Sequence, residues 1–324
     1  MSKIVVAGGA GYIGSHTCKA LHAAGHTPVV FDNLSNGHRD AVRWGPFEEG
    51  DITDGARLRE VLDIHAPDAV IHFAGLIEVG HSVQDPSAFW HNNVIGSWTL
   101  LDAMRDREVK RMVFSSTAAL YGIPGTVHVD EDSPTQPVSP YGDTKNAVEA
   151  MLANYAGSDG LQYAALRYFN AAGADPEGDL GERHDPESHL IPLVLQVALG
   201  QRDHIAVFGT DYPTPDGTAV RDYVHVTDLA AAHVAAVEHL TNNGNSLIVN
   251  LGTGAGYSVR QIIEACRQIT GAPIPHQDSA RRAGDPPHLV ATASRANALL
   301  GWNPAHSDLE TIVATAWRWH SENP

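Results

Sequence analysis

Short hydrophobic runs alternate with longer amphipathic segments along the first 170 residues of the chain. Five of these runs are rich in β-branched residues and predict strands, at Ile4–Ala7, Pro28–Phe31, Ala69–Phe73, Arg111–Ser115 and Tyr163–Arg167. The segments between them predict helices at His16–Ala24, Ala56–Ile64, Val94–Arg105 and Lys145–Tyr155. Strands that alternate with helices indicate an α/β fold with a doubly wound parallel sheet.

The pattern becomes more irregular after Asn170. Residues Ala171–Ser188 and Gly209–Gly217 are rich in turn-forming residues and predict loops. Further helices are expected at Leu190–Leu199, Thr227–Leu240 and Val259–Ile269, and a further strand at Leu247–Leu251. Thr227 or Asp228 is the expected N-cap of the second of these helices. We therefore expect a smaller, mixed α/β C-terminal part beside the sheet.

A glycine-rich loop follows the first predicted strand and precedes a helix, with the sequence Gly8-Gly9-Ala10-Gly11-Tyr12-Ile13-Gly14. Glycines allow a tight turn and let a pyrophosphate approach the helix N-terminus, which stabilises its negative charge. Asp32 closes the second predicted strand, where a carboxylate accepts hydrogen bonds from a ribose diol and repels a 2′-phosphate. The combination indicates a Rossmann domain that binds NAD in preference to NADP.

Composition restricts the possible partners. The chain has 324 residues, a length that corresponds to about two globular domains. Of these residues 43% are hydrophobic, enough for a sizeable core, and 18% are charged. The formal net charge of −17 opposes binding to nucleic acid or to an anionic membrane, so neither partner is expected. The two cysteines cannot form a disulfide framework, and no hydrophobic run approaches the length of a membrane span. We expect a cytoplasmic protein.

Tyr141 and Lys145 stand four residues apart, a spacing that places both on one face of a helix. A tyrosine has an unperturbed pKa of about 10, and a nearby lysine cation together with a nicotinamide ring would lower it. The chain has only four lysines, so this one is not routine surface composition. Ser115, Ser116 and Thr117 end the preceding strand, at the edge where such sheets bind ligands. These residues indicate an enzyme that transfers hydride.

Longer runs carry a more specific signal, namely GGAGYIGSH (8–16), FDNLSNG (31–37), IHFAGL (71–76), HNNVIGS (91–97), VFSSTAALYG (113–122), SPYGDTK (139–145), LRYFNAAGADP (166–176), GDLGE (178–182), VFGTDYPTPDGTAVRDYVHVTDLA (207–230), NLGTGAGYSV (250–259) and RRAGDPP (281–287). With these runs the chain resembles the extended short-chain dehydrogenase/reductase superfamily and, within it, the UDP-glucose (UDP-galactose) 4-epimerases. The resemblance covers essentially the whole chain, and the run that ends at Ala230 is its most specific part.

The resemblance implies reversible epimerisation at C4 of a UDP-hexose, UDP-galactose to UDP-glucose, through a 4-keto intermediate. Tyr141 would take the proton from the sugar 4-hydroxyl while tightly bound NAD oxidises C4, and the keto sugar would then turn over and be reduced on its other face. Lys145 would hold the nicotinamide ribose and lower the pKa of the tyrosine. Thr117 would hydrogen-bond the sugar oxygen and the tyrosine. The reaction is redox-neutral, so NAD is not consumed.

The resemblance also implies two sets of binding residues. The cofactor would contact Gly8, Gly11, Tyr12, Ile13, Gly14, Asp32, Asn33, Asp51, Ile52, Phe73, Ala74, Gly75, Asn92, Ser115, Tyr141, Lys145 and Tyr168. The UDP-sugar would contact Thr117, Tyr141, Asn170, His189, Leu190, Phe208, Arg221, Arg282 and Asp285. Two arginines suit a diphosphate because the planar guanidinium pairs bidentately with phosphate oxygens.

Three positions depart from the commonest pattern of the resembled family. Ile77 stands where many relatives carry a lysine near the cofactor, and His189 replaces an asparagine that touches the substrate. Leu289 stands where relatives carry either a bulky tyrosine or a small residue. The size of this side chain governs the room for an N-acetyl group on the sugar. The breadth of sugar specificity therefore stays open.

Other functions remain as alternatives. A related NAD-dependent enzyme could act on a UDP-pentose, a UDP-N-acetylhexosamine or a UDP-uronate. A dehydratase is disfavoured, because Ala118 and Ala119 follow Thr117 where dehydratases carry an Asp-Glu pair. An inactive NAD-binding regulator would be expected to lose Tyr141 or Lys145, and both are present.

The nineteen histidines raise the question of a metal site. The pairs His184/His189 and His233/His239 lack the i, i+4 spacing of helical metal ligands. We also expect no acidic residues beside them. The sequence therefore predicts no bound metal.

We expect residues 1–170 to form the NAD-binding domain, with 222–252 returning to it. The UDP-sugar-binding domain would comprise 171–221 and 253–324. Members of the resembled family are mostly homodimers joined by two helices from each subunit. Here those helices would lie near Asn93–Arg105 and Lys145–Tyr155, so a homodimer is expected.

Overall fold

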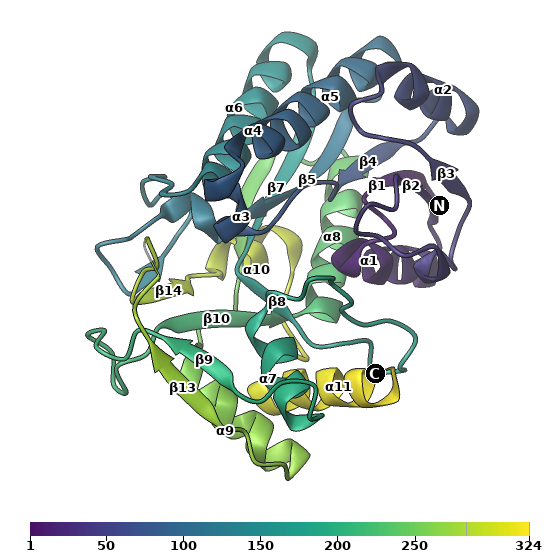
Figure 1. The fold of residues 1–324 in the computed structure, drawn as a ribbon. Helices are drawn as coiled ribbons and strands as arrows, with labels where there is room; N and C mark the ends of the chain where they lie inside the picture. Colours follow the sequence, from purple (N-terminus) through teal and green to yellow (C-terminus); the bar gives the residue numbers. More distant parts are fainter. Residues whose placement is uncertain (283, 324) are drawn as a thin grey trace.

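A seven-stranded parallel sheet forms the centre of the larger half of the molecule (Figure 1). The computed structural model describes residues 1–282 and 284–323, so one position of the RRAGDPP run and the last residue lie outside the described residues. The strand order is β11-β7-β5-β4-β1-β2-β3. These strands are β1 (Lys3–Ala7), β2 (Thr27–Asp32), β3 (Phe47–Glu49), β4 (Ala69–His72), β5 (Arg111–Thr117), β7 (Gln162–Tyr168) and β11 (Leu247–Leu251).

Helices cover both faces of this sheet (Figure 1). One face packs against α1 (Tyr12–Ala23), α8 (Val226–Thr241) and α10 (Ser294–Leu300), and the other against α2 (Gly55–His65), α5 (Gly96–Asp106) and α6 (Pro140–Asp159). Successive residues of β1 point to opposite faces: Ile4 and Val6 belong to the first core, and Val5 and Ala7 to the second. Both faces are buried, which is why these strands read as unbroken hydrophobic runs.

The smaller half is built on a second sheet, of order β12-β10-β14-β6, in which β8 also pairs with β10. Two further strands, β9 and β13, pair with each other. The strands are β6 (His128–Val129), β8 (Asn170–Ala172), β9 (Ile205–Phe208), β10 (Val220–His225), β12 (Gly256–Ser258), β13 (His276–Ser279) and β14 (His288–Ala291). The helices are α7 (Leu190–Ala198), α9 (Val259–Thr270) and α11 (Leu309–Glu322), which share one hydrophobic core.

Several short helical elements lie in the connections between the main strands and helices. They are two 3₁₀ turns, at Arg39–Ala41 and Ala118–Tyr121, the helices α3 (Val79–Gln84) and α4 (Pro86–Phe89), and a π-helical segment, Trp90–Ile95, that runs directly into α5. The expected helix at Val94–Arg105 therefore starts in a wider turn than an α-helix.

All the strands and helices expected from the hydrophobic pattern are present, with shifted ends. Two helices start several residues earlier than expected. Helix α1 begins at Tyr12 because Gly11 serves as its N-cap, without a side-chain hydrogen bond. Helix α6 begins at Pro140, since Ser139 Oγ accepts a hydrogen bond from Gly142 N at 3.2 Å and proline suits the first helical position. Tyr141 thus lies in the first turn of α6.

Two local expectations are wrong. The N-cap of α8 is His225, whose Nδ1 accepts from Thr227 N at 3.1 Å. Asp228 cannot serve as the cap because its buried carboxylate binds the segment before α11, accepting from Ala305 N at 3.0 Å and from Ser307 Oγ at 2.6 Å. Strand β8 lies partly where a loop was expected, because β10 provides a parallel partner.

Every helix in the described part of the chain is too short or too polar to cross a lipid bilayer. The expected domain boundaries stay a prediction, since the chain passes repeatedly between the two halves.

Candidate active site

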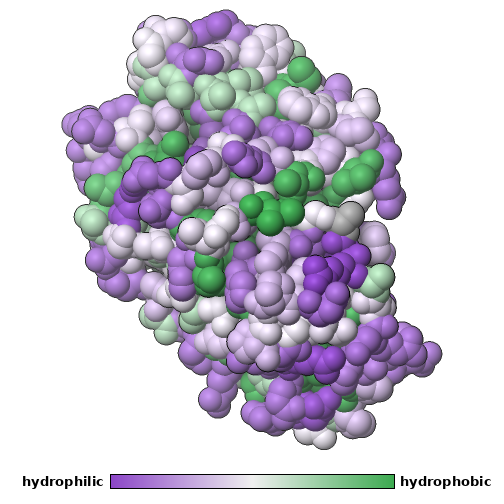
Figure 2. All heavy atoms as spheres, turned by 90° about the vertical axis from the view of Figure 1, so that its left-hand side faces the viewer, coloured by the Kyte–Doolittle hydropathy of each residue, from purple (hydrophilic) through white to green (hydrophobic). Residues whose placement is uncertain are grey.

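A cavity of about 1210 Å³ lies at the carboxyl ends of the parallel strands and is walled by residues of both halves. Figure 2, which views the molecule from the left of Figure 1, shows hydrophobic side chains in a band across the middle of that face. Every site residue expected from the sequence lines this cavity, except Asp51 and Lys145. These two lie just behind lining residues: Asp51 accepts from Asn33 Nδ2 at 2.8 Å, and Lys145 Nζ donates to Ser115 O at 3.0 Å.

The glycine loop forms one end of the cavity. Gly8 has a φ of 82°, and a Cβ there would lie 2.5 Å from the backbone N of Ala74. A Cβ on Gly14 would lie 2.2 Å from Gly8 O. Only glycine allows this close approach of two backbone segments. The first turn of α1 carries no acidic residue and no side-chain cap, so its N–H groups are suited to an anion.

Asp32 holds the glycine loop in place. Its carboxylate accepts from Ala10 N at 2.9 Å and from Leu34 N at 2.8 Å, and burial raises its pKa. The sequence predicted that Asp32 binds a ribose diol. In this structure the carboxylate faces the cavity but already accepts two backbone hydrogen bonds, so it also has a structural role.

Tyr141 and Thr117 lie together on the cavity wall. Burial raises the pKa of Tyr141, and a hydrogen bond with Thr117 opposes that rise. Thr117 Oγ1 accepts from Ala119 N at 3.1 Å, so its own proton remains free to be donated to the tyrosine oxygen. The geometry supports the pairing expected from the sequence.

Lys145 is buried at 3% exposure, and its Nζ lies 6.0 Å from the centre of the Tyr141 ring. Burial lowers the pKa of Lys145 to about 8. The sequence predicted that this lysine, together with nicotinamide, lowers the pKa of Tyr141. In the chain alone burial dominates and raises the pKa of Tyr141.

Ser115 connects this group to Tyr168. The two hydroxyl groups are hydrogen-bonded, and burial raises the pKa of Tyr168. Since Ser115 O also holds Lys145, the three side chains form one unit at the end of β5 and β7.

The opposite wall comes mainly from the smaller half. Arg221 and Asp285 form an ion pair, so these two expected substrate ligands bind each other here. The guanidinium of Arg282 stacks 4.1 Å from the centre of the Phe208 ring. The arrangement provides two cationic groups at one end of the cavity and Tyr141 in the same space.

The comparisons with known proteins agree with this geometry. The sequence profile of the "NAD dependent epimerase/dehydratase family" matches residues 4–252. The chain belongs to this family. A UDP-glucose 4-epimerase of Halalkalibacterium halodurans is 53% identical over 321 residues, which is 99% of this chain and 96% of that protein.

Solved structures of epimerases in the family have the same fold. The UDP-glucose 4-epimerase from Brucella ovis in complex with NAD is 53% identical, covers 98% of both chains and superimposes with a TM-score of 0.96. The UDP-glucose-4-epimerase from Stenotrophomonas maltophila with bound NAD and formylated UDP-arabinopyranose is 41% identical, with a TM-score of 0.96 over 100% of this chain and 99% of that one. The predicted Rossmann-type sheet is thereby confirmed.

Sequence reasoning missed a polar cluster next to the glycine loop of this epimerase/dehydratase family member. Glu182 and Glu187 lie beside His184 and His189, so the expectation that these histidines lack acidic neighbours is wrong. The spacing Glu-x-His-x-x-Glu-x-His was the available signal; the i, i+4 criterion for the histidine pair applies to a helix, whereas here the segment is a loop.

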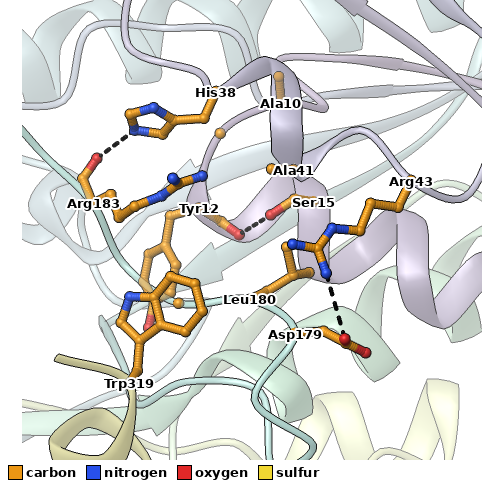
Figure 3. Close-up of a pocket in the computed structure, with 12 residues that line it drawn as sticks. Ala10, Tyr12, Ser15, His38, Ala41, Arg43, Asp179, Leu180, Arg183 and Trp319 are labelled. Atoms are coloured by element: carbon orange, nitrogen blue, oxygen red, sulfur yellow. Dashed lines mark hydrogen bonds and ion pairs between the residues drawn. The ribbon is translucent and has the colours of Figure 1, made fainter. Parts of the chain in front are cut away.

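The segment before this cluster packs on the glycine loop, around a small pocket (Figure 3). Tyr12 Oη donates to Gly173 O at 2.6 Å, and a ring nitrogen of His38 lies 2.9 Å from Arg183 O. Figure 3 shows Trp319 of α11 on the other side of the pocket. The glycine loop is therefore supported from behind by the smaller half.

A second group that sequence reasoning missed lies beside β5. Arg167 and Glu149 form a buried ion pair with N–O distances of 3.0 and 2.6 Å, and Ser116 Oγ donates to the same carboxylate at 2.5 Å. This network joins β5, β7 and α6. No sequence motif predicts this network, because its members are far apart in the sequence.

Proposed function

We propose that this protein is a UDP-glucose 4-epimerase that interconverts UDP-galactose and UDP-glucose with bound NAD. The observation that carries the proposal is that Thr117 and Tyr141 line one cavity together with the glycine loop and two arginines, with Lys145 just behind the wall on Ser115 O. The relatives named above support the same activity over the full chain.

The residues of this chain fit NAD. The glycine loop provides close backbone contact and the open N-terminus of α1 for the pyrophosphate, and residues at the ends of β2, β4, β5 and β7 would hold the rest. When bound, NAD would supply the reversible oxidation at sugar C4 and a positive charge beside Tyr141. The cofactor contacts named from the sequence are part of this proposal.

Tyr141 would take the proton of the sugar 4-hydroxyl and return it after the sugar turns over. The buried phenol holds its proton too tightly in the chain alone, so the reaction depends on the added positive charge of the cofactor. Lys145 would orient the nicotinamide ribose, since its Nζ is anchored on Ser115 O at 3.0 Å. Thr117 would donate to the phenolate and stabilise it.

The UDP part would lie against the smaller half. Arg221 and Arg282 would bind the diphosphate, which must compete with Asp285 for Arg221. These local cations, with the N-terminus of α1, allow a protein of net charge −17 to hold anionic ligands. Asn170, His189, Leu190 and Phe208 also face this space and complete the proposed contacts. Leu289 lines the cavity, so it is the position to test for N-acetylated sugars.

We further propose a homodimer. Trp90, Ile95 and Trp98 are 43%, 47% and 48% exposed, along the segment that enters α5. Trp98 also contacts Tyr155 of α6, so the exposed aromatic surface spans the two helices expected at the interface. Covering this surface with a second copy would remove it from water. The expected cytoplasmic location stays a prediction.

Incubation of the purified protein with UDP-galactose, without added NAD, tests the proposed function. UDP-glucose should appear on ion-exchange chromatography. If none forms even with added NAD, the UDP-hexose assignment is wrong. Parallel reactions with UDP-N-acetylglucosamine and UDP-xylose would identify the alternative substrates.

A further inference from the structure

The loop between β8 and α7 brings four side chains with metal-binding groups to one point. They are Glu182, His184, Glu187 and His189, and one ligand atom from each lies within 4.8 Å of all the others. None of the residue roles assigned above uses this cluster as a unit. Its four members come from eight consecutive residues, so a single loop closes around the point.

The distances suit a common ligand. His184 Nδ1 lies 3.1 Å from Glu182 Oε1 and 3.7 Å from Glu187 Oε1, and His189 Nδ1 also contacts Glu182 Oε1. Four ligands at about 2.0–2.2 Å from a zinc ion in tetrahedral geometry are roughly 3.3–3.6 Å apart. Small side-chain movements would therefore place all four around one ion.

The side chains are also held in position. Glu187 Oε1 accepts from the backbone N of Ser188 at 2.7 Å and of His189 at 2.8 Å. Glu182 is 3% exposed, and its carbonyl oxygen accepts from Trp319 Nε1 at 3.2 Å. His184 Nδ1 is buried and has no hydrogen-bond partner of good geometry among the described residues, although it faces two carboxylates. A metal ion would satisfy that nitrogen.

We propose that Glu182, His184, Glu187 and His189 bind one divalent transition-metal ion, with zinc as the best fit. Two imidazole nitrogens with two carboxylate oxygens favour zinc or a neighbouring transition metal over magnesium or calcium, which prefer oxygen ligands only. The two carboxylates balance the charge of a divalent ion. This proposal reverses the prediction of no metal made from the sequence.

A second acidic group in the chain differs from this cluster, because a lysine side chain already occupies it. Asp175, Glu177 and Asp179 also lie close together, but Lys19 Nζ sits among them at 2.8, 2.6 and 2.8 Å. That group already holds a cation of the chain itself. The cluster at 182–189 contains no lysine or arginine partner of this kind among the described residues.

The ion would stabilise one wall of the cavity. His184, Glu187 and His189 line the cavity, and the ring of His184 lies 6.3 Å, edge to face, from that of Tyr12 in the glycine loop. Binding would fix the loop between the glycine loop and the start of α7. On the proposed function, loss of the ion should raise the KM for the UDP-sugar more than it lowers kcat.

Metal content tests this proposal without reference to activity. The full chain, expressed without a histidine tag, would be stripped with a chelator and titrated with Zn²⁺ against a chromophoric competitor. We expect one zinc per chain and a higher thermal midpoint with zinc. Co²⁺ in its place should give the intense visible absorption of a four-coordinate site. Failure of the unaltered protein to bind either ion stoichiometrically would overturn the proposal.

Variants locate the site. His184→Gln and Glu187→Gln should each weaken zinc binding by at least about tenfold, as loss of supporting groups alone does in other zinc sites. His276→Gln, which removes an exposed histidine on β13, should leave affinity and stoichiometry unchanged. Unchanged zinc binding in both cluster variants would show that the metal binds elsewhere and refute the assignment. Because the readout is bound metal, the result does not depend on whether UDP-galactose is the substrate.

Discussion

At the scale of single residues, the proposed chemistry depends on a phenol whose pKa the fold raises. Burial disfavours the phenolate of Tyr141, and Thr117 only partly opposes this effect. The phenolate is scarcely populated in the empty protein, and a cationic cofactor would lower the pKa and populate it, so the base would act only when NAD is bound. On the proposed function, the pKa shift of Tyr141 would therefore couple catalysis to cofactor binding.

Removing the phenol oxygen tests its role. Tyr141→Phe should lower kcat by about 10²–10⁴-fold, the usual contribution of a positioned acid–base group, with bound NAD retained. Tyr163→Phe is a matched control, because Tyr163 is equally buried but packs in the hydrophobic core between the sheet and α2, α5 and α6 and does not line the cavity. Steady-state assays on both variants, with nucleotide content measured after denaturation, would check this. Equal activity of Tyr141→Phe and the control would exclude tyrosine as the base.

Lys145 predicts a pH effect on stability. Burial lowers its pKa from 10.5 to about 8, so between these values the unfolded chain binds more protons than the folded one. The contribution of this lysine to stability is therefore lowest below about pH 8 and rises with pH up to about 10.5. Lys145→Met should raise the free energy of unfolding of the nucleotide-free protein at neutral pH, and this advantage should shrink as the pH rises. Urea denaturation across that range measures the difference; an advantage independent of pH would contradict the assignment.

At the scale of elements, α6 carries the proposed catalytic residues. Ser139 caps its first turn, Tyr141 and Lys145 follow, and Glu149 fixes the helix to β7 through Arg167. Ser139 lines the cavity, whereas Glu149 and Arg167 lie outside its wall, so the ion pair can be altered without changing a residue that lines the site.

The cap gives a stability prediction. Ser139→Ala should lower the free energy of unfolding by about 1 kcal/mol, because Gly142 N loses its acceptor at the N-terminus of α6. Ser158→Ala, near the other end of the same helix and exposed, should change it by less than about 0.5 kcal/mol. Chemical denaturation of both variants provides the comparison. Equal losses would mean that the cap makes no specific contribution.

The buried pair predicts non-additive effects. Arg167→Met should cost about 3–5 kcal/mol, because it leaves the Glu149 carboxylate buried without its partner. The double variant Glu149→Leu, Arg167→Met should recover much of that loss, since no unpaired charge then remains. Denaturation of the single and double variants measures the coupling. A double variant less stable than either single one would contradict this account.

The same scale shows what the sequence could predict. The central strands were predictable because burial on both faces of a parallel sheet produces unbroken hydrophobic runs, and the glycine loop was predictable from its glycine spacing between a strand and a helix. Strands β8 and β10 were not, since short segments such as Asn170–Ala172 become strands only through pairing with distant partners. Helix α11 was overlooked although Asp308 caps it and Ile312, Val313 and Ala316 form its buried face. The cluster at 182–189 could not be predicted, because it depends on the conformation of the loop, which local sequence patterns do not determine.

At the scale of the whole molecule, the proposed dimer makes a separate prediction. Trp98→Arg should weaken association, because it places a charge in an exposed aromatic surface between α5 and α6. Leu299→Arg, a similarly exposed position on α10, serves as the control. Light scattering across a range of concentrations would show the shift to monomer. A wild-type protein that is monomeric at all concentrations would contradict the proposed dimer.

The molecule as a whole is negatively charged, but its cavity contains local positive groups. A net charge of −17 opposes binding of extended anions, while on the proposed function the helix N-terminus and two arginines inside the cavity would bind a dinucleotide and a diphosphate. Both halves contribute to that cavity, so the function belongs to the complete chain.

The central claim is that the sugar is oxidised and reduced at C4 without exchange with solvent. The most direct measurement uses UDP-galactose that carries deuterium at C4, incubated in ordinary water with the purified protein and no added NAD. Mass spectrometry and NMR of the product should show UDP-glucose with deuterium still at C4. UDP-glucose that has lost the deuterium to water, or the absence of UDP-glucose, would contradict the account.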